Sequence, residues 1–300
     1  MEWKKTLNNL AARRGYQIQR LRPDPIAGPP RPGDRLLERP TFVLCSVRSG
    51  STLLRVLLSS HSMIHCPHEM HLRHIGVQPL AVYPRKSLAE VGLDRRRLRY
   101  LLWDRVLQRE LAASGKKLLV NKTPNDVFIV DRILECWPDA RFIFLLRHPA
   151  AIARSRQAVR PQDTPARNAR TVARYCNAVE AARRAHDGLT VRYEELAADP
   201  AATTRRVCHY LGVPWERGML DYGEFAHRGL KAGLGDWNEN IKSGRVQAPE
   251  PPPREHEIPP ELIDLCRAWG YLDGQEPVPQ ESHATVTKSN VEMSVEPPAL

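Results

Sequence analysis

Short apolar runs that alternate with helical segments constrain this 300-residue chain most strongly. The runs are TFVLC (41–45), KLLVN (117–121), RFIFLL (141–146) and LTVRY (189–193). Segments with helical periodicity lie between and after them, at 52–60, 126–137, 150–159, 165–186, 194–198 and 200–211. Strands that are apolar on both faces are typical of a parallel sheet covered on both sides. The sequence therefore predicts an α/β fold with a central parallel sheet flanked by helices on both faces.

Composition divides the chain into three regions. Residues 1–38 hold a short helical segment and a Pro-rich run, which is typical of an extended connector. Residues 39–273 have the size of one domain. Residues 274–300 are polar, contain Pro, Ser and Glu, and lack an amphipathic period, so we expect a disordered tail.

Charge and cysteine usage predict the compartment and the type of ligand. No stretch approaches the ~20 apolar residues of a membrane-spanning helix, and the first residues lack the apolar core of a signal peptide. Six scattered cysteines without a CxxC pair indicate a reduced, cytoplasmic protein. The net charge of +11 favours anionic ligands, and the Ala-, Arg- and Pro-rich composition is typical of a GC-rich bacterial genome.

The segment after the first predicted strand has the features of an anion site. It runs Cys-Ser-Val-Arg-Ser-Gly-Ser-Thr over 45–52 and opens a predicted helix, whose N–H groups and dipole favour an anion. The glycine permits close backbone approach, and the other side chains supply donors. The candidate ligand-binding residues are Arg48, Ser49, Gly50, Ser51 and Thr52. The alternative is a Ser-rich turn that only caps the helix.

This segment departs from a Walker A loop. In that register Gly50 and Thr52 match, but Cys45 replaces the first glycine and Ser51 replaces the lysine that reaches the β- and γ-phosphates. A P-loop kinase is therefore the less favoured enzyme class. A non-catalytic protein that binds a nucleotide or polyanion is the second alternative.

A second polar site follows the strand at 141–146, where Arg147 ends the strand and Ser155 lies on the next helix. When this second site is considered together with the segment at 45–52, the whole sequence resembles the PAPS-dependent sulfotransferases. The motifs that carry the resemblance occur in the order of that family: VRSGSTLL (47–54), VNKTPND (120–126), RFIFLLRHPAAIARS (141–155), VRYEELAADP (191–200), LGVPW (211–215) and KAGLGDW (231–237). The RSG form is similar to bacterial, tyrosylprotein and some carbohydrate sulfotransferases.

The resemblance implies a single P-loop-like sulfotransferase domain over 39–273. It would move a sulfuryl group from PAPS (3′-phosphoadenosine 5′-phosphosulfate) to a hydroxyl, or less favourably an amine, and release adenosine 3′,5′-bisphosphate. The residues at 48–52 would hold the 5′-phosphate and the sulfuryl oxygens. Arg147 and Ser155 match the pair that binds the 3′-phosphate, and Tyr193 is a candidate contact for the adenine.

The late motif KAGLGDW resembles a loop that closes over the cofactor, with Lys231 and Gly235 as its candidate ligands. It departs from the family pattern at Leu230, where an arginine is usual, and at Ala232, where a glycine is usual. Lys231, Lys242 or Arg245 would then replace the missing arginine.

The resemblance also implies the catalytic residues. Glu69 lies 21 positions after Arg48, the spacing of the catalytic glutamate in tyrosylprotein sulfotransferases, and is the predicted base. Lys122 occupies the position of the family lysine that neutralises the leaving oxygen, with Arg48 as a further cation. We expect no metal, because no β/γ-phosphate bridge has to be neutralised. The alternatives are a solvated carboxylate and a surface lysine.

Two further patterns offer competing interpretations. Histidines at 61, 65, 68, 71 and 74 would line one helical face and suggest zinc, but HExxH would need a histidine at Leu72. Lining of the acceptor pocket is favoured, and His65, His68 or His71 is the alternative base. The Arg-rich stretch 94–105 has Leu98, Leu101, Leu102 and Val106 at helical spacing. This favours an amphipathic helix over a nucleic-acid site.

The acceptor stays open among small molecules, carbohydrates and glycolipids. A peptide tyrosine is less favoured, since those enzymes usually work in a secretory compartment. A homo-oligomer is neither indicated nor excluded by the sequence.

Truncation after Asp273 tests the predicted tail. Because residues 274–300 lack the apolar surface needed to offset the entropy of ordering, their removal should leave melting temperature and turnover unchanged. Calorimetric melting of both chains measures this. A marked fall in melting temperature would show that the tail docks on the domain.

Overall fold

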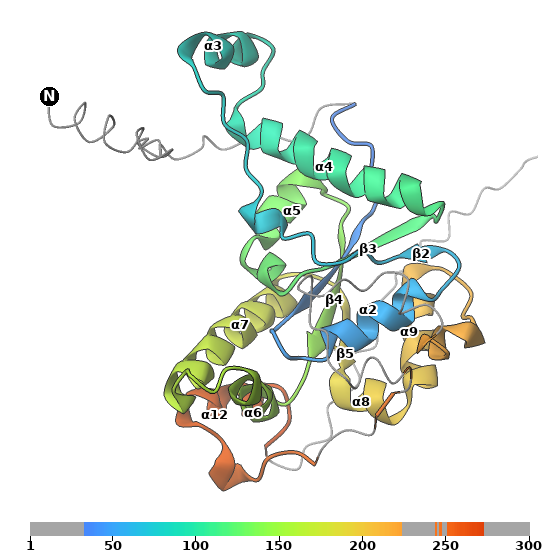
Figure 1. Cartoon of the computed structure of the whole chain (residues 1–300), viewed down its shortest axis with the longest axis vertical. Coiled ribbons are helices and arrows are strands. Elements are labelled where there is room, and N and C mark those ends of the chain that lie inside the picture. Colours follow the sequence, from blue (N-terminus) through green and yellow to red (C-terminus); the bar gives the residue numbers. More distant parts are fainter. Residues whose placement is uncertain (1–32, 224–243, 245, 248–250, 273–300) are drawn as a thin grey trace, which may run out of the picture.

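Five parallel strands form the central sheet of this computed structural model, which describes residues 33–223, 244, 246–247 and 251–272 (Figure 1). The strand order is β2-β3-β1-β4-β5. The strands are β1 (Thr41–Cys45), β2 (Ile64–His65), β3 (Leu118–Lys122), β4 (Arg141–Leu146) and β5 (Leu189–Arg192). The four predicted strands are confirmed, with β3 shifted by one residue and β5 ending one residue early. The two-residue edge strand β2 was not predicted.

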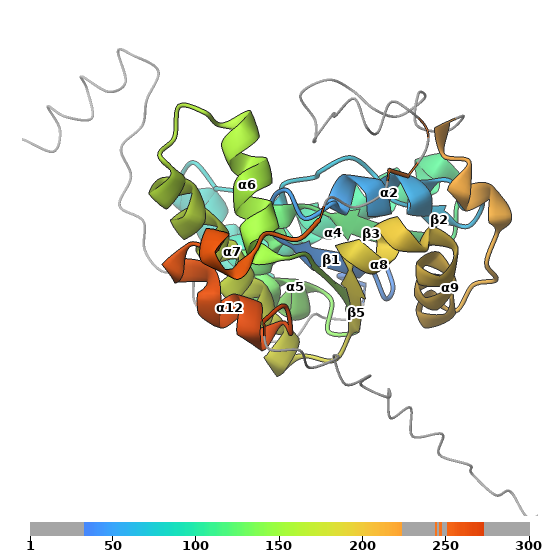
Figure 2. The same cartoon turned by 90° about the horizontal axis from the view of Figure 1, so that it is seen from below.

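Alternating side chains of the strands separate two apolar clusters. Phe42 and Leu44 of β1 belong to the first cluster, while Val43 and Cys45 belong to the second. The first cluster includes buried residues of α4 (Arg95–Ser114), α5 (Val130–Cys136), α6 (Pro149–Val159), α7 (Pro165–Ala185) and α12 (Ile263–Ala268). The second includes those of α2 (Ser51–Ser59), α8 (Tyr193–Ala198) and α9 (Pro200–Leu211). Figure 2 shows these two groups on opposite sides of the sheet, which confirms the predicted fold class.

The strand order reverses at β1, which pairs with β3 on one side and with β4 on the other. Ligands of open α/β sheets bind outside the carboxyl ends of the strands at such a reversal. The segment 46–50, which follows β1, therefore lies where a ligand is expected.

The predicted helix over 126–137 is wrong in its continuity. Pro124–Phe128 forms a 3-10 turn, and α5 begins only at Val130. Ile129 between them has φ −134° and ψ 24°, outside the helical range. The Asn121 amide of β3 donates to the Asp126 carboxylate at 2.6 Å, and this bond holds the turn against the sheet.

The shared helical face predicted for the histidines at 61–74 is also wrong. Ile64 pairs with Leu118 of β3, so this part of the segment is a strand. Only a short 3-10 turn, Leu72–His74, follows it. Pairing at the sheet edge replaces the helix that the spacing suggested.

The Arg-rich stretch does form a helix, α4, but its buried face differs from the predicted leucine stripe. Tyr100, Trp103, Asp104 and Leu107 are buried instead. The Asp104 carboxylate accepts from the backbone N–H groups of Leu36 and Leu37 and from the Trp137 indole. These three bonds explain why an acidic side chain is drawn into the apolar cluster.

The helix α3 (Val82–Glu90) projects from the body beyond α4 (Figure 1) and buries none of its residues. No described helix is long and apolar enough to cross a membrane. All six cysteines are free thiols and buried. Residues 1–32, and the tail predicted at 274–300, lie outside the described part of the chain.

Candidate active site

The loop after β1 is shaped for close backbone approach. Arg48 and Gly50 both have left-handed backbone conformations, with φ 63° and 83°. The Ser49 hydroxyl donates to the Ser46 carbonyl at 2.8 Å, which closes the turn. Gly50 precedes α2, and no side chain caps the first N–H groups of this helix. The turn therefore presents backbone donors, together with the buried Ser51 and Thr52, at the end of β1.

Gly50 is required by its neighbour Tyr193 as well as by its own conformation. A Cβ at position 50 would lie 2.1 Å from Cδ2 of the Tyr193 ring. The Arg147 guanidinium lies over the face of the same Tyr193 ring, with its Cζ atom 4.3 Å from the ring centroid. Tyr193, the first residue of α8, thus packs between the loop and Arg147.

The structure brings the two predicted phosphate-binding segments together. The Arg147 guanidinium donates to the Arg48 carbonyl at 2.9 Å, and Arg48 Nε donates to the Ser155 hydroxyl at 3.2 Å. These contacts link the end of β4 and helix α6 to the loop after β1. The pairing of Cys45 with Leu145 in adjacent strands explains this proximity, because both segments leave the sheet at one edge.

A carboxylate that the sequence analysis missed, Glu194, holds the turn that follows Arg147. Glu194 accepts from the His148 backbone N–H at 2.9 Å and from the Tyr271 hydroxyl at 2.8 Å. The Tyr271 and His148 rings also pack at 4.8 Å between centroids. Glu194 therefore ties the turn that carries Arg147 to the segment after α12. Its place at the carboxyl end of β5 was the available signal.

The predicted base and the predicted lysine form an ion pair. Lys122 Nζ lies 2.5 Å from Glu69 Oε1, and the two side chains are 1% and 14% exposed. The second oxygen of Glu69 lies 3.6 Å from His71 Nε2. A buried ammonium requires such a partner, because an unpaired charge in this place would be strongly destabilising.

Thr123 fixes the loop that carries Glu69. Its hydroxyl oxygen accepts from the backbone N–H groups of Met70 and His71, at 3.1 and 3.4 Å. His71 has the left-handed φ of 50°. Consecutive residues of β3 and its exit, Lys122 and Thr123, thus hold Glu69 through its side chain and through the backbone beside it.

A second carboxyl group, Asp126, lies behind this pair. Burial raises its pKa from 3.8 to about 8; the nearby Glu69 charge adds to this rise, while the Asn121 hydrogen bond and Lys122 oppose it. One oxygen, Oδ1, has no hydrogen-bond partner. This environment favours the protonated form of Asp126 at neutral pH. Asp126 is the last residue of the motif VNKTPND (120–126), but no pattern in the sequence predicted a role for it.

The histidines have separate surroundings. His65 faces Glu110 at 3.8 Å, and burial lowers its pKa. His61 is buried between the Pro214 carbonyl and the Met63 N–H. Of the three proposed alternative bases, His71 is the one that lies beside Glu69, with its Nε2 atom 3.6 Å from Glu69 Oε2. Within the described residues, no three His, Cys, Asp or Glu side chains form a group suited to a metal ion.

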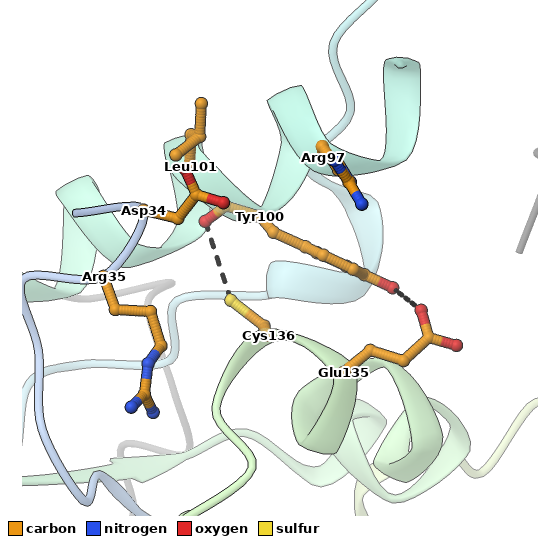
Figure 3. A pocket seen from close by; sticks show the side chains of 7 residues that line it. All are labelled: Asp34, Arg35, Arg97, Tyr100, Leu101, Glu135 and Cys136. Atoms are coloured by element: carbon orange, nitrogen blue, oxygen red, sulfur yellow. Dashed lines mark hydrogen bonds between the residues drawn. The ribbon is translucent and has the colours of Figure 1, made fainter. Parts of the chain in front are cut away.

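Lys231 and Gly235, with the alternatives Lys242 and Arg245, lie outside the described residues. A pocket elsewhere in the described structure lies between α4, α5 and the segment before β1 (Figure 3). It is lined by Asp34, Arg35, Arg97, Tyr100, Leu101, Glu135 and Cys136. It shares no residue with the site at the carboxyl ends of the strands.

Replacing Asp126 with Asn should change how stability depends on pH. The folded state keeps the Asp126 proton up to about pH 8, whereas the unfolded carboxyl loses it near its ordinary pKa of 3.8. The stability that Asp126 gains from this proton is therefore fully present below pH 3.8 and is lost as pH rises from 3.8 to about 8. The slope approaches 1.4 kcal/mol, roughly, per pH unit. The Asn side chain keeps the Asn121 bond without titrating. The free energy of unfolding of Asp126→Asn minus that of wild type should therefore increase from pH 5 to pH 8. Urea denaturation at each pH measures this difference.

The exposed Asp264 provides the matched control. Asp264→Asn should show the same pH dependence as wild type. Parallel pH profiles for wild type and Asp126→Asn would contradict the raised pKa.

Comparison with known proteins gives related sequences. The sulfotransferase family profile matches residues 40–217. The nodulation protein NoeE of Sinorhizobium fredii is 35% identical over 127 residues, which cover 38% of this chain and 30% of that protein. The protein-tyrosine sulfotransferase of Drosophila melanogaster is 24% identical over 200 residues, 60% of this chain and 39% of that protein. The chain therefore spans less than half the length of these relatives.

Solved structures show the same fold. The sulfotransferase domain from the curacin biosynthetic pathway has a TM-score of 0.56 at 23% identity, and the match covers 78% of this chain and 98% of that domain. The sulfotransferase domain of the Synechococcus PCC 7002 olefin synthase has a TM-score of 0.53 at 22% identity, covering 79% and 98%. Because the family profile spans more than half of the chain, including both predicted phosphate-binding segments and the Glu69–Lys122 pair, this protein belongs to the sulfotransferase family.

Proposed function

We propose that this protein transfers a sulfuryl group from PAPS to a hydroxyl of an acceptor. The observation that carries the proposal is the buried Lys122–Glu69 ion pair at the sheet edge where the Arg147 side chain donates to the Arg48 carbonyl. This arrangement supplies cations for the phosphates of the donor and a carboxylate for the proton of the acceptor.

The donor would bind along the β1 and β4 edge. The N–H groups of the α2 N-terminus, Ser51, Thr52 and Arg48 would hold the 5′-phosphate and the sulfuryl oxygens. Arg147 and Ser155 would hold the 3′-phosphate. Since Arg48 contacts Ser155 and Arg147 contacts the Arg48 carbonyl, occupation of one phosphate position would favour the geometry of the other. Tyr193, Lys231 and Gly235 remain proposed cofactor contacts.

The transfer would follow the logic of phosphoryl transfer. The acceptor oxygen bonds to sulfur, the bond from sulfur to the 5′-phosphate oxygen breaks, and adenosine 3′,5′-bisphosphate leaves. Glu69 takes the acceptor proton. Lys122 stabilises the charge on the leaving oxygen, and this requires it to share its protons between Glu69 and that oxygen. A metal-independent, cytoplasmic reaction is part of this proposal.

Hydroxyls of small molecules, carbohydrates or glycolipids are the proposed acceptors. A P-loop kinase is less favoured, because Ser51 occupies the Walker lysine position. The second alternative, a protein that binds the nucleotide without turnover, is distinguished from an active sulfotransferase by an activity assay. Incubation with PAPS and a hydroxyl library, followed by mass spectrometry, should detect sulfated products. Addition of EDTA should leave their formation intact.

Glu69→Gln should lower kcat by about 10²–10⁴-fold, because the amide keeps the shape and removes the basicity. Affinity for adenosine 3′,5′-bisphosphate should change little. The variant leaves the Lys122 ammonium without a carboxylate, so turnover is measured well below its own melting temperature. Glu261→Gln is the matched control, an exposed carboxylate outside the site. Near-normal turnover of Glu69→Gln would move the base role to His71 and then to His68 or His65.

Arg147→Ala should weaken binding of adenosine 3′,5′-bisphosphate at least tenfold, since a charge-assisted hydrogen bond contributes about 1.5–3 kcal/mol. Calorimetry measures this. Adenosine 5′-phosphate, which lacks the 3′-phosphate, should lose less affinity on the same substitution. Arg170→Gln on the exposed face of α7 controls for net charge. Equal wild-type affinities for the two nucleotides would refute the assignment of Arg147.

A further inference from the structure

Arg55 is a buried cation that neither the sequence analysis nor the proposed reaction has used. It is the fifth residue of α2, one helical turn after Ser51, and is 7% exposed. Residues four apart share a helix face. One turn further on, the Ser59 hydroxyl donates to the Cys66 carbonyl at 2.8 Å. This face of α2 therefore packs against the segment that leads from β2 to Glu69.

The Arg55 guanidinium has no hydrogen-bond acceptor among the described residues. Burial lowers its pKa, and the nearby Cys66 and Glu69 partly oppose this effect. The oxygens of Glu69 face other groups, since Oε1 contacts Lys122 and Oε2 lies nearest His71. Its five N–H donors thus have no acceptor in the described protein and only a small opening to solvent, since the residue is 7% exposed. A guanidinium held in this way is accessible to a ligand that supplies the missing acceptors.

The position of Arg55 separates it from the donor-binding arginines. On the β1 and β4 side, Arg48 donates to the Ser155 hydroxyl and Arg147 donates to the Arg48 carbonyl. Arg55 lies instead beside the segment that leads from β2 to Glu69, the proposed base that the acceptor has to reach. The cations on the donor side already match the phosphates of PAPS. Arg55 is therefore available for a negative charge brought by the acceptor.

We propose that Arg55 binds an acidic group of the acceptor, a carboxylate, sulfate or phosphate, beside the hydroxyl that Glu69 deprotonates. This inference rests on the proposed function and narrows its substrate class to acidic hydroxyl compounds. A guanidinium binds these groups through paired N–H donors. The acidic group would satisfy the buried donors and fix the hydroxyl relative to Glu69.

Binding to the enzyme saturated with adenosine 3′,5′-bisphosphate tests the proposal without requiring turnover. The probes are two matched pairs, methyl glucuronide with methyl glucoside and hydroxybenzoate with hydroxybenzamide, and binding is measured by calorimetry or ligand-observed NMR. Wild type should bind at least one acidic probe tenfold or more tightly than its neutral partner. Arg55→Gln should abolish this preference, and Arg55→Lys should retain part of it. Arg170→Gln should behave like wild type.

Three results would overturn the proposal. Wild type could show no preference for either acidic probe. Arg55→Gln could weaken neutral and acidic probes equally, which would place Arg55 in support of the Glu69 loop. Arg55→Gln could also weaken the binding of adenosine 3′,5′-bisphosphate itself, which would show that Arg55 contributes to the donor site. Circular dichroism verifies folding of each variant, and Arg55→Lys keeps the charge if the Gln variant does not fold.

Sulfuryl transfer is measured separately on the same probes with PAPS. An acidic preference in binding without any sulfated product would refute the proposed function while leaving the anion site of Arg55 in place. Transfer to neutral and acidic probes at equal kcat/KM would support the function and refute the role of Arg55.

Discussion

The pairing of β1 with a parallel strand on each side determines the site. Val43 lies beside Lys122 in β3, and Cys45 lies beside Leu145 in β4. Parallel strands in this register end at one edge of the sheet, so the residues that follow them must meet there. Arg48, Lys122 and Arg147 are thereby brought to one edge from three distant parts of the chain. Two apolar clusters, one on each face, hold the three strands in that register.

Cations gathered in this way need acidic partners, and the two nearby carboxyl groups have different surroundings. Glu69 contacts the buried Lys122 ammonium directly. Among the described residues, the Asp126 side chain accepts a hydrogen bond only from the Asn121 amide, and burial raises its pKa to about 8. A neutral Asp126 leaves the Lys122 charge to Glu69. The division between a paired carboxylate and a protonated acid follows from which carboxyl the ammonium reaches.

Sequence reasoning succeeded where one local pattern determines the structure. Four of the five strands were predictable because each contains a short, mainly apolar run, and the motif residues Arg48, Arg147, Ser155, Glu69 and Lys122 do meet at one edge. It failed where tertiary partners decide. The two residues of β2 are too few for a pattern, and Asp104 turns α4 inward only because Leu36, Leu37 and Trp137 supply donors. Arg55 lies in the predicted helix at 52–60, and no pattern in the sequence singles it out. The contacts of Lys231 and Gly235 remain predictions.

The projecting helix α3 belongs to the long connection between β2 and α4, which also carries Glu69. This connection leaves the sheet after a strand of two residues, and α3 buries no side chain. Leu72 is buried in the first apolar cluster, and the Ile75 carbonyl accepts from the Trp103 indole, so the connection is anchored as far as Ile75. Changes in α3 itself, which lies beyond these contacts, should leave the strand register and the loops of β1 and β4 undisturbed. Surface libraries for directed evolution are therefore best placed in α3, over Val82–Glu90.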